Sequence, residues 1–436
     1  MTDRENYTNR RHHHHHHHRS PERASRPERS TPEELKALNE GLREAVNGGE
    51  PDKTDTVYTT GKTPGTGTTG RKKQFHRSSS RRRSGHRKKI TAGKVVLTLL
   101  AVLAGIILVA GASFLVLQRI GAGRLLKQEE PEEPDVVRMS EAAQTDISYE
   151  EGVIRYNGEK YRYNKDLTTI LFMGIDRSVQ AEDNQNVVIG ETGQADTLLL
   201  GVVDNHKKKI TLINISRDTI ASVARYNTDG EYVDLMDMQI CLAYAFGDGQ
   251  EKSCENVVRA VSDYFYGIPI SSYAAIDYEG IGVLTDVVGG VDVKVPDDYF
   301  AERYPEMSKG NTVTLNGRQA ITFVRSRDSF SYEANNGRMQ RQKQFLLGLI
   351  RKTLAATRRN LSIPLSLYNS VSDYTVTDLT AAEITYLASK AVQYGFSENN
   401  MRSIAGEIAA LDEKAAFYAD EKKFYELVLE VFYNKE

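Results

Sequence analysis

The chain contains 436 residues, of which 39% are hydrophobic and 27% charged, and its formal net charge is −2. Residues 1–89 carry 21 Lys and Arg against 11 Asp and Glu, whereas the remainder carries 36 against 48. A basic arm on an acidic body excludes a uniformly basic nucleic-acid-binding protein. Two cysteines, Cys241 and Cys254, are too few for a disulfide-dense scaffold or a four-cysteine zinc site.

One uncharged apolar run, residues 95–117, is 23 residues long. A transmembrane helix needs about 20 such residues, and a buried core helix rarely runs so long without charge. Ten Lys and Arg precede the run within residues 71–89, and the stretch that follows it is acidic. Because positive charge stays on the cytoplasmic side, the sequence predicts a single-pass protein of the cell membrane with a cytoplasmic N-terminus and an extracytoplasmic C-terminal domain.

The composition divides the chain into four parts. Residues 1–89 are poor in apolar side chains, which predicts a disordered basic cytoplasmic arm. Residues 90–118 contain the predicted transmembrane helix, residues 119–147 a predicted acidic stalk, and residues 148–436 the predicted extracytoplasmic catalytic domain. The arm has no evident helix-turn-helix pattern, so no nucleic-acid partner is expected.

Strand and helix patterns alternate along this domain. Alternating residues around Asn157-Gly158 predict a β-hairpin, because this dipeptide suits the two positive φ angles of a tight turn. Further strands are expected at 169–174, 197–203, 210–215, 273–277, 291–295, 320–325 and 401–405, and helices at 238–246, 253–265, 337–357, 379–393 and 420–433. This order predicts one α/β domain with a mixed central sheet and helices packed on both faces.

Two aspartates lie where apolar strands begin or end. Asp176 follows the strand at 169–175, and Asp196 precedes the next one. If these strands are antiparallel, the two carboxylates lie side by side, where they repel unless a cation lies between them. Mg²⁺ suits such a pair because it needs few protein ligands. The alternative is that each aspartate caps a turn or pairs with a neighbouring arginine.

Arginines gather in a short stretch of the acidic body. Arg325 and Arg327 fall on one face of the predicted strand, since side chains alternate. Arg338 and Gln342 are neighbours four residues apart on one helical face. Arginine holds phosphate oxygens bidentately and stays charged, so the group predicts a phosphate clamp. The alternative is a solvated basic face.

Several motifs occur in the order found in one known family. They are the segments LFMGID (171–176), ADT (195–197), ISRDT (215–219), AYAFG (243–247), VGGV (288–291), LNGRQA (315–320), VRSR (324–327) and GRMQRQ (337–342). Over residues 168–350 the chain resembles the LytR-CpsA-Psr family. The resemblance implies an α/β domain that binds a polyprenyl-pyrophosphate-linked glycan, with the lipid in an apolar tunnel, and transfers the glycan to peptidoglycan.

The resemblance also implies roles for individual residues. Asp176 and Asp196 correspond to the carboxylates associated with Mg²⁺, and together with Arg217 they make the expected catalytic set. The residues that correspond to pyrophosphate contacts are Arg217, Arg325, Arg327, Arg338 and Gln342. The sequence departs from the family pattern at Gln194, where the family usually has Arg, and at Gln239-Ile240-Cys241, where it usually has Lys-Ile-Asn.

The expected function is therefore Mg²⁺-dependent transfer of a cell-wall glycopolymer from its polyprenyl-pyrophosphate carrier to peptidoglycan. A pyrophosphatase acting on the same lipid, or a non-catalytic wall-binding or regulatory protein, are the alternatives. Residues 257–261 and 281–288 are apolar and either line a lipid tunnel or belong to the ordinary core.

The two cysteines lie on successive predicted helices joined by Gly247-Asp248-Gly249. An antiparallel helical pair brings such residues within the Cα separation of about 4.4–6.8 Å that a disulfide requires. An extracytoplasmic compartment permits oxidation, so a Cys241–Cys254 disulfide is expected. Two buried free thiols are the alternative.

Overall fold

The computed structural model describes residues 116–126, 131, 136–150, 152–176, 189, 192–326, 333–411 and 414–436. The predicted cytoplasmic arm and nearly all of the predicted span (95–117) lie outside this part of the chain. Within the part that is described, no helix is both long and apolar enough to cross a membrane.

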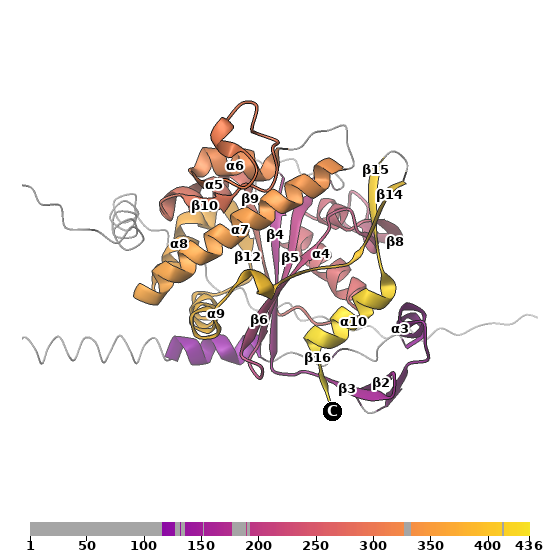
Figure 1. Ribbon diagram of the computed structural model, residues 1–436. Coiled ribbons are helices and arrows are strands. Elements are labelled where there is room, and N and C mark those ends of the chain that lie inside the picture. The colour runs from indigo at the N-terminus through magenta and orange to yellow at the C-terminus, as the bar shows by residue number, and fades with distance from the viewer. Residues whose placement is uncertain are drawn as a thin grey trace, which may run out of the picture.

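A six-stranded mixed sheet forms the centre of the body, in the order β12-β9-β4-β5-β6-β13 (Figure 1). Its strands are β4 (Leu167–Ile175), β5 (Ala195–Asp204), β6 (Lys209–Ile215), β9 (Ser272–Asp277), β12 (Thr375–Thr377) and β13 (Met401–Ser403). β5 is antiparallel to both β4 and β6, whereas β9 runs parallel to β4 and β13 parallel to β6. The predicted mixed α/β sheet is confirmed.

Helices cover both faces of this sheet, as β5 shows. Leu198 and Leu200 point into the main core, together with α3 (Val136–Ala143), α4 (Glu251–Tyr264) and α10 (Glu421–Phe432). Leu199 and Val203 point to the opposite face, against α7 (Glu333–Arg359) and α9 (Ala381–Tyr394). Successive side chains of a strand point to opposite faces, so a continuous apolar run gives a sheet that is buried on both sides.

Smaller sheets surround the central one. A four-stranded sheet has the order β1-β2-β3-β16, built from Ser148–Glu150, Val153–Tyr156, Glu159–Tyr163 and Tyr433–Lys435. Its β2–β3 turn places Asn157 and Gly158 at φ 51° and 80°, which confirms the predicted hairpin. Three further pairs are β7 (Ile220–Tyr226) with β8 (Tyr232–Gln239), β10 (Val291–Lys294) with β11 (Thr312–Leu315), and β14 (Gly406–Leu411) with β15 (Lys414–Ala419).

The remaining helices are α5 (Tyr278–Val287), α6 (Gly317–Arg325) and α8 (Ile363–Val371). Short 3-10 helices occupy Ile240–Phe246 (η2), Pro305–Met307 (η3), Ser372–Tyr374 (η4) and Glu398–Asn400 (η5). The helix expected at 238–246 is therefore a 3-10 helix that begins at Ile240, because the two preceding residues still belong to β8.

The strand predicted at 320–325 is wrong, because these residues form the helix α6. Asn316 and Gln319 make a reciprocal capping box, with each side chain accepting a hydrogen bond from the other residue's N–H at 3.0 Å. Ala320, Phe323 and Val324 are buried, at the spacing of one helical face. Arg325 therefore ends a helix and does not lie on a strand, and Arg327 lies outside the described residues.

The stalk predicted at 119–147 is also too long. Met139 and Ala142 of α3 are buried in the main core, so the folded body begins before residue 148. The helix of residues 116–125 lies beside α9 in Figure 1. Much of the expected linker is thus part of the folded structure.

Candidate functional site

Polar side chains converge at one edge of the central sheet, where β4 and β6 end and β5 begins. Ile175 of β4 pairs with Ala195 of β5, after a register shift at Gly174. The Asp176 N–H donates to the Gln194 carbonyl at 3.2 Å, and the Gln194 N–H donates to Asp176 Oδ1 at 2.7 Å. Asp176 and Asp196 therefore occupy neighbouring positions at this edge, as the antiparallel arrangement predicts. Asp176 is exposed and Asp196 is buried.

Asp196 accepts hydrogen bonds from three buried groups. Its Oδ1 accepts from the Arg217 guanidinium, and its Oδ2 accepts from Arg338 Nη1 at 3.0 Å and from Tyr278 Oη at 3.2 Å. The Arg338 side chain is only 2% exposed. Two buried guanidinium groups therefore converge on one carboxylate, and guanidinium groups are suited to binding phosphate oxygens.

Arg217 is held by several acceptors besides Asp196. It donates to Gln194 Oε1, and its Nε lies 3.5 Å from Asp218 Oδ1. Cys241 Sγ lies 4.0 Å from the same Gln194 oxygen. Two of the positions at which the sequence departs from the family pattern, Gln194 and Cys241, thus meet beside Arg217, and the third, Gln239, donates to Asp218 Oδ1 at 2.9 Å. The side-chain amide of Gln194 orients the Arg217 guanidinium without adding charge to the site.

Tyr278 is a member of the site that the sequence analysis missed. It begins α5 directly after Asp277, whose side chain caps that helix by accepting from the Gly280 N–H at 2.8 Å. Burial raises the pKa of the Tyr278 hydroxyl, so it remains a hydrogen-bond donor to Asp196. The Arg325 guanidinium lies over the Tyr278 ring at 5.3 Å, which brings this exposed arginine to the rim of the site.

Two arginines of α7 that lie one turn apart have different partners. Arg338 reaches Asp196, while Gln342, one turn later on α7, donates to the Val324 carbonyl at 3.2 Å. Arg341 instead binds the end of α6, through the Phe323 and Ser326 carbonyls at 3.2 and 2.5 Å, and pairs with Asp297 at 2.7 Å. Arg341 is therefore structural, whereas Arg338 and Gln342 face the site.

An apolar cavity of about 580 Å³ lies between the central sheet and α5, α7, α8 and α9. At one end it is lined by Gly174, Thr197, Tyr278 and Gln342, which belong to or adjoin the polar site. At the other it is lined by Leu379, Ile384, Leu387, Ala388, Phe396 and Met401. The apolar segment at 281–288 contributes Ile281 and Leu284, whereas Val257 and Val261 lie in the main core on the opposite face. The cavity thus joins a long apolar space to the buried arginines of the polar site.

The sequence profile of the LytR_cpsA_psr family matches residues 135–430, well over half of the chain. The chain belongs to the LytR-CpsA-Psr family.

Among its relatives are two polyisoprenyl-teichoic acid–peptidoglycan teichoic acid transferases. They are TagV of Bacillus subtilis (strain 168) and TagU of Enterococcus faecalis (strain ATCC 700802 / V583), each 28% identical over 257 and 261 residues respectively. The matches cover 57% and 58% of this chain, and 59% and 68% of the relatives. The chain therefore spans about three fifths of the length of TagV. The crystal structure of B. subtilis TagV has a TM-score of 0.46 at 24% identity, covering 61% of this chain and 96% of that one.

The described residues of this LytR-CpsA-Psr protein contain no cluster of three or more His, Cys, Asp or Glu side chains that could hold a metal ion. Mg²⁺, however, needs only one or two carboxylates when phosphate oxygens and waters complete its octahedron. Asp176 is exposed at this edge of the sheet. Asp196 accepts three hydrogen bonds, which leaves about one of the four lone-pair sites of its carboxylate for an ion. These two donors therefore fit the ion, with Asp176 the more open of them.

The predicted Cys241–Cys254 disulfide is wrong, because both cysteines are buried free thiols. Cys241 lies beside Gln194 in the polar site, whereas Cys254 points into the main core of the LytR-CpsA-Psr domain. η2 is a 3-10 helix that packs against α4, but the two side chains point to different surroundings and do not meet. Burial raises the pKa of Cys241 to about 11 and raises that of Cys254 as well.

We expect neither cysteine of the native protein to react with iodoacetamide at pH 8. Only the thiolate reacts, and a thiol with a pKa of about 11 is about one part in a thousand ionised at that pH. Unfolding without reductant should expose two alkylatable cysteines, which mass spectrometry can count. Unfolded, unreduced protein that takes up no label would contradict the free thiols and restore the disulfide.

Proposed function

We propose that this protein transfers a cell-wall glycopolymer from a polyprenyl-pyrophosphate carrier to peptidoglycan. The observation that carries the proposal is the continuity of the apolar cavity with the buried arginines of the polar site, through the shared lining residues Tyr278 and Gln342. A ligand that suits both parts has a long hydrocarbon chain and an anionic head. The names of TagV and TagU, which describe polyisoprenyl-linked teichoic acid as the donor, support the same class of substrate.

In the proposed complex, the pyrophosphate lies across Arg217, Arg338 and the rim residue Arg325. Asp196 holds Arg217 and Arg338 in place before the substrate arrives, so that little reorganisation is needed during the reaction. Arg327, which the family resemblance adds to this group, belongs to the proposal although it lies outside the described residues.

The proposed reaction is displacement at the glycan-proximal phosphorus. A peptidoglycan hydroxyl forms the new P–O bond, the bond to the bridging oxygen breaks, and polyprenyl phosphate leaves. The hydroxyl proton passes to a carboxylate at the sheet edge, and Asp176 is the one exposed to solvent. Negative charge grows on the bridging and leaving oxygens, where the arginines stabilise it.

Mg²⁺ is the cofactor that we propose for this step, with Asp176 and Asp196 as its protein ligands. The bound ion would neutralise part of the negative charge on the pyrophosphate oxygens. We also propose that the protein is anchored in the cell membrane by residues 95–117, with residues 1–89 in the cytoplasm and the catalytic domain outside.

Chelation with EDTA is expected to abolish transfer, and added Mg²⁺ to restore it. A binding measurement with Mn²⁺ as a paramagnetic probe should show that Asp176→Asn weakens occupancy of the site by the ion. Full transfer activity in EDTA-treated protein that contains no metal would rule out the cofactor. Unchanged Mn²⁺ binding in Asp176→Asn would remove this carboxylate from the ligand set.

The decisive test of the proposed function is product analysis with a labelled lipid-linked glycopolymer and peptidoglycan oligomers. Covalent glycan–peptidoglycan product is the expected result. Free phosphorylated glycan would instead assign the protein as a pyrophosphatase, and an unchanged donor would assign it as a binding protein.

A further inference from the structure

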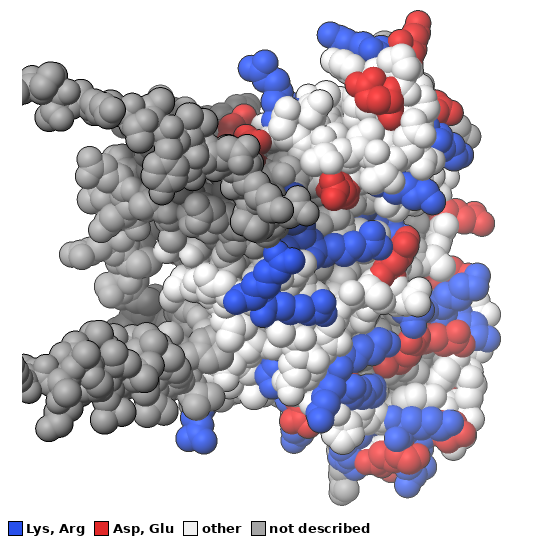
Figure 2. Space-filling model, turned by 60° about the vertical axis from the view of Figure 1, so that its left-hand side comes forward, with Lys and Arg blue, Asp and Glu red and all other residues white. Residues whose placement is uncertain are grey.

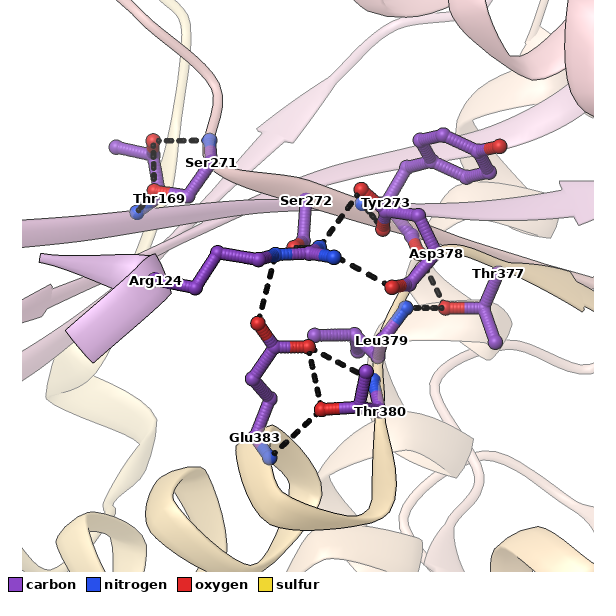
Figure 3. Close-up of polar contacts among 10 residues, drawn as sticks. All are labelled: Arg124, Thr169, Ser271, Ser272, Tyr273, Thr377, Asp378, Leu379, Thr380 and Glu383. Carbon is purple, nitrogen blue, oxygen red and sulfur yellow. Dashed lines mark hydrogen bonds and ion pairs between the residues drawn. The ribbon is translucent and has the colours of Figure 1, made fainter. Parts of the chain in front are cut away.

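The helix of residues 116–125 is fastened to the catalytic domain by Arg124. Its Nε lies 2.7 Å from Glu383 Oε1, and its Nη2 lies 3.2 Å from Asp378 Oδ2 (Figure 3). The same Nη2 donates to Ser272 Oγ and to the Asp378 carbonyl, both at 3.1 Å. One guanidinium thus bridges β9, the segment that follows β12, and the first turn of α9.

Backbone packing adds to this contact. A Cβ atom added at Gly121 would lie 2.3 Å from the Ala382 carbonyl oxygen, so only glycine allows the helix to approach α9 so closely. Leu125 is completely buried. Gly121, Arg124 and Leu125 have the spacing of one helical face, so the whole face is docked.

The acceptors of Arg124 also support the wall of the apolar cavity. The Glu383 carboxylate, whose side chain is 2% exposed, caps α9 by accepting from the Thr380 N–H at 2.7 Å. Asp378 Oδ1 accepts from the Tyr273 N–H at 2.9 Å. Their sequence neighbours Leu379 and Ile384 line the cavity. Helix 116–125 is therefore attached to the outer side of the elements that enclose the cavity at its α9 end.

Apolar side chains at the N-terminal end of this helix are uncovered. Val116 and Ile120 lie one turn apart, and they are 55% and 60% exposed. The uncharged run at 95–117 continues directly into this helix and is long enough to cross a bilayer. Figure 2 turns the left-hand side of the molecule in Figure 1 toward the viewer and shows Lys and Arg side chains, with Asp and Glu among them, beside uncharged surface. Such a surface suits the interface of an anionic bilayer.

We propose that helix 116–125 holds the α9 end of the cavity at the bilayer surface, with Arg124 as the residue that positions it, so that a lipid carrier passes from the membrane into the cavity. This inference rests on the proposed function, because it takes a membrane-embedded carrier as the ligand. The partner of the exposed apolar side chains is the lipid bilayer. Arg124 acts through Asp378 and Glu383 and contacts no substrate.

The docking is tested first by hydrogen exchange of the full chain in lipid nanodiscs containing anionic lipid. Arg124→Gln removes the charge that Asp378 and Glu383 share, so the amides of residues 116–125 should exchange at least about tenfold faster, while those of β4–β6 keep their rates. Arg162→Gln is the matched control, because Arg162 is 48% exposed against 49% for Arg124 and pairs through its Nε with Glu436 at 2.6 Å. Equal exchange at residues 116–125 in Arg124→Gln and the parental chain would overturn the proposal.

Transfer kinetics test the consequence for substrate entry. With the carrier embedded in the nanodisc, Arg124→Gln should raise KM about tenfold with little change in kcat, because the cavity loses its fixed position relative to the membrane. A water-soluble short-chain carrier analogue should be used equally well by Arg124→Gln, Arg162→Gln and the parental chain. An equal loss with both substrates would assign Arg124 a purely structural role, and no loss with either would show that the helix is not needed for entry.

These outcomes are separable from failure of the proposed function. If the parental chain converts neither carrier, the transferase proposal fails. The positioning role is then decided by the depth of a fluorophore on Gln393→Cys, an exposed residue in the last turn of α9, measured with lipid-attached quenchers. Quenching that is lost in Arg124→Gln supports the proposal, and quenching that is absent or unchanged overturns it.

Discussion

Asp196→Asn is expected to slow glycan transfer by about a hundredfold to a thousandfold and to lower the melting temperature of the protein. The substitution keeps the volume of the side chain but removes the only charge that Arg217 and Arg338 share. Both guanidinium groups then remain buried with incomplete compensation, which costs about 3–5 kcal/mol of stability. Inorganic pyrophosphate should recover part of this loss, because it supplies the missing negative charge. Thermal unfolding with and without pyrophosphate, together with kcat, measures both effects.

Asp204→Asn is the matched control, because Asp196 and Asp204 are the second and the last residue of the same strand, β5. Asp204 is also buried, and it accepts from Asn164 Nδ2 at 3.0 Å and from the Lys207 N–H at 2.7 Å. This variant should lose stability but keep its transfer rate, and pyrophosphate should not stabilise it more than it stabilises the parental chain. Equal activity losses in the two variants would reduce Asp196 to a structural ion pair.

The central strands could be predicted from sequence because both of their faces are buried. Residues 169–174, 197–203 and 210–215 are short, continuous apolar runs, and β4, β5 and β6 contain them with little change in their bounds. The antiparallel order of β4 and β5 then placed Asp176 near Asp196. A strand that is buried on both faces has a continuous run of apolar residues, and this run can be recognised without knowing which elements cover it.

The β7–β8 pair shows why other elements were missed. Nearly every residue of β8 is exposed or half-buried, and Tyr232 and Leu235 are both 57% exposed. β8 buries neither of its faces and therefore has no regular apolar alternation from which a strand could be predicted. β16 could not be predicted for a different reason. Its three residues become a strand only by pairing with β3, which lies 270 residues earlier in the chain.

The strand predicted at 320–325 was wrong because it rested on side-chain type and not on the helix-capping signal that precedes these residues. Phe323 and Val324 favour strands, but Asn316 and Gln319 already mark the start of a helix in the sequence. Tyr278 was also missed although the sequence contained a signal for it. The strand predicted at 273–277 ends in Asp277-Tyr278, and β9 pairs in parallel with β4 so that Asp277 lies opposite Ile175. The end of a parallel neighbour is a place where a further site residue could have been sought.

The arginine cluster could be predicted only in part. Arg338 and Gln342 lie on one helical face at a spacing that sequence reveals directly. The separation of Arg338 from Arg341 depends instead on where α6 ends, since Arg341 binds the carbonyls of Phe323 and Ser326. Such contacts depend on tertiary packing, and no local pattern encodes them.

Filling the apolar cavity is expected to weaken binding of the long-chain carrier by about tenfold to a hundredfold. Ala388 of α9 lines the cavity, and Ala388→Phe places an aromatic ring in space that the proposed lipid chain occupies. Displacing two or three buried methylene groups costs about 2 kcal/mol at about 0.8 kcal/mol each. Binding of inorganic pyrophosphate should be unchanged, because the polar cluster lies at the other end of the cavity. Titration with carriers of increasing chain length measures the effect, which should grow with length.

Ala381→Phe provides the control for this experiment, because Ala381 begins the same helix but is exposed. It adds the same ring outside the cavity and should leave carrier affinity at the parental value. A ring that enters an existing apolar space strains the core little, so the unfolding free energy of Ala388→Phe should change by no more than about 1–3 kcal/mol. If a folded Ala388→Phe protein binds the long-chain carrier as tightly as Ala381→Phe does, the lipid chain does not occupy this part of the cavity. The α9 end would then lose its place in the transfer reaction, even if the arginine cluster still binds the pyrophosphate.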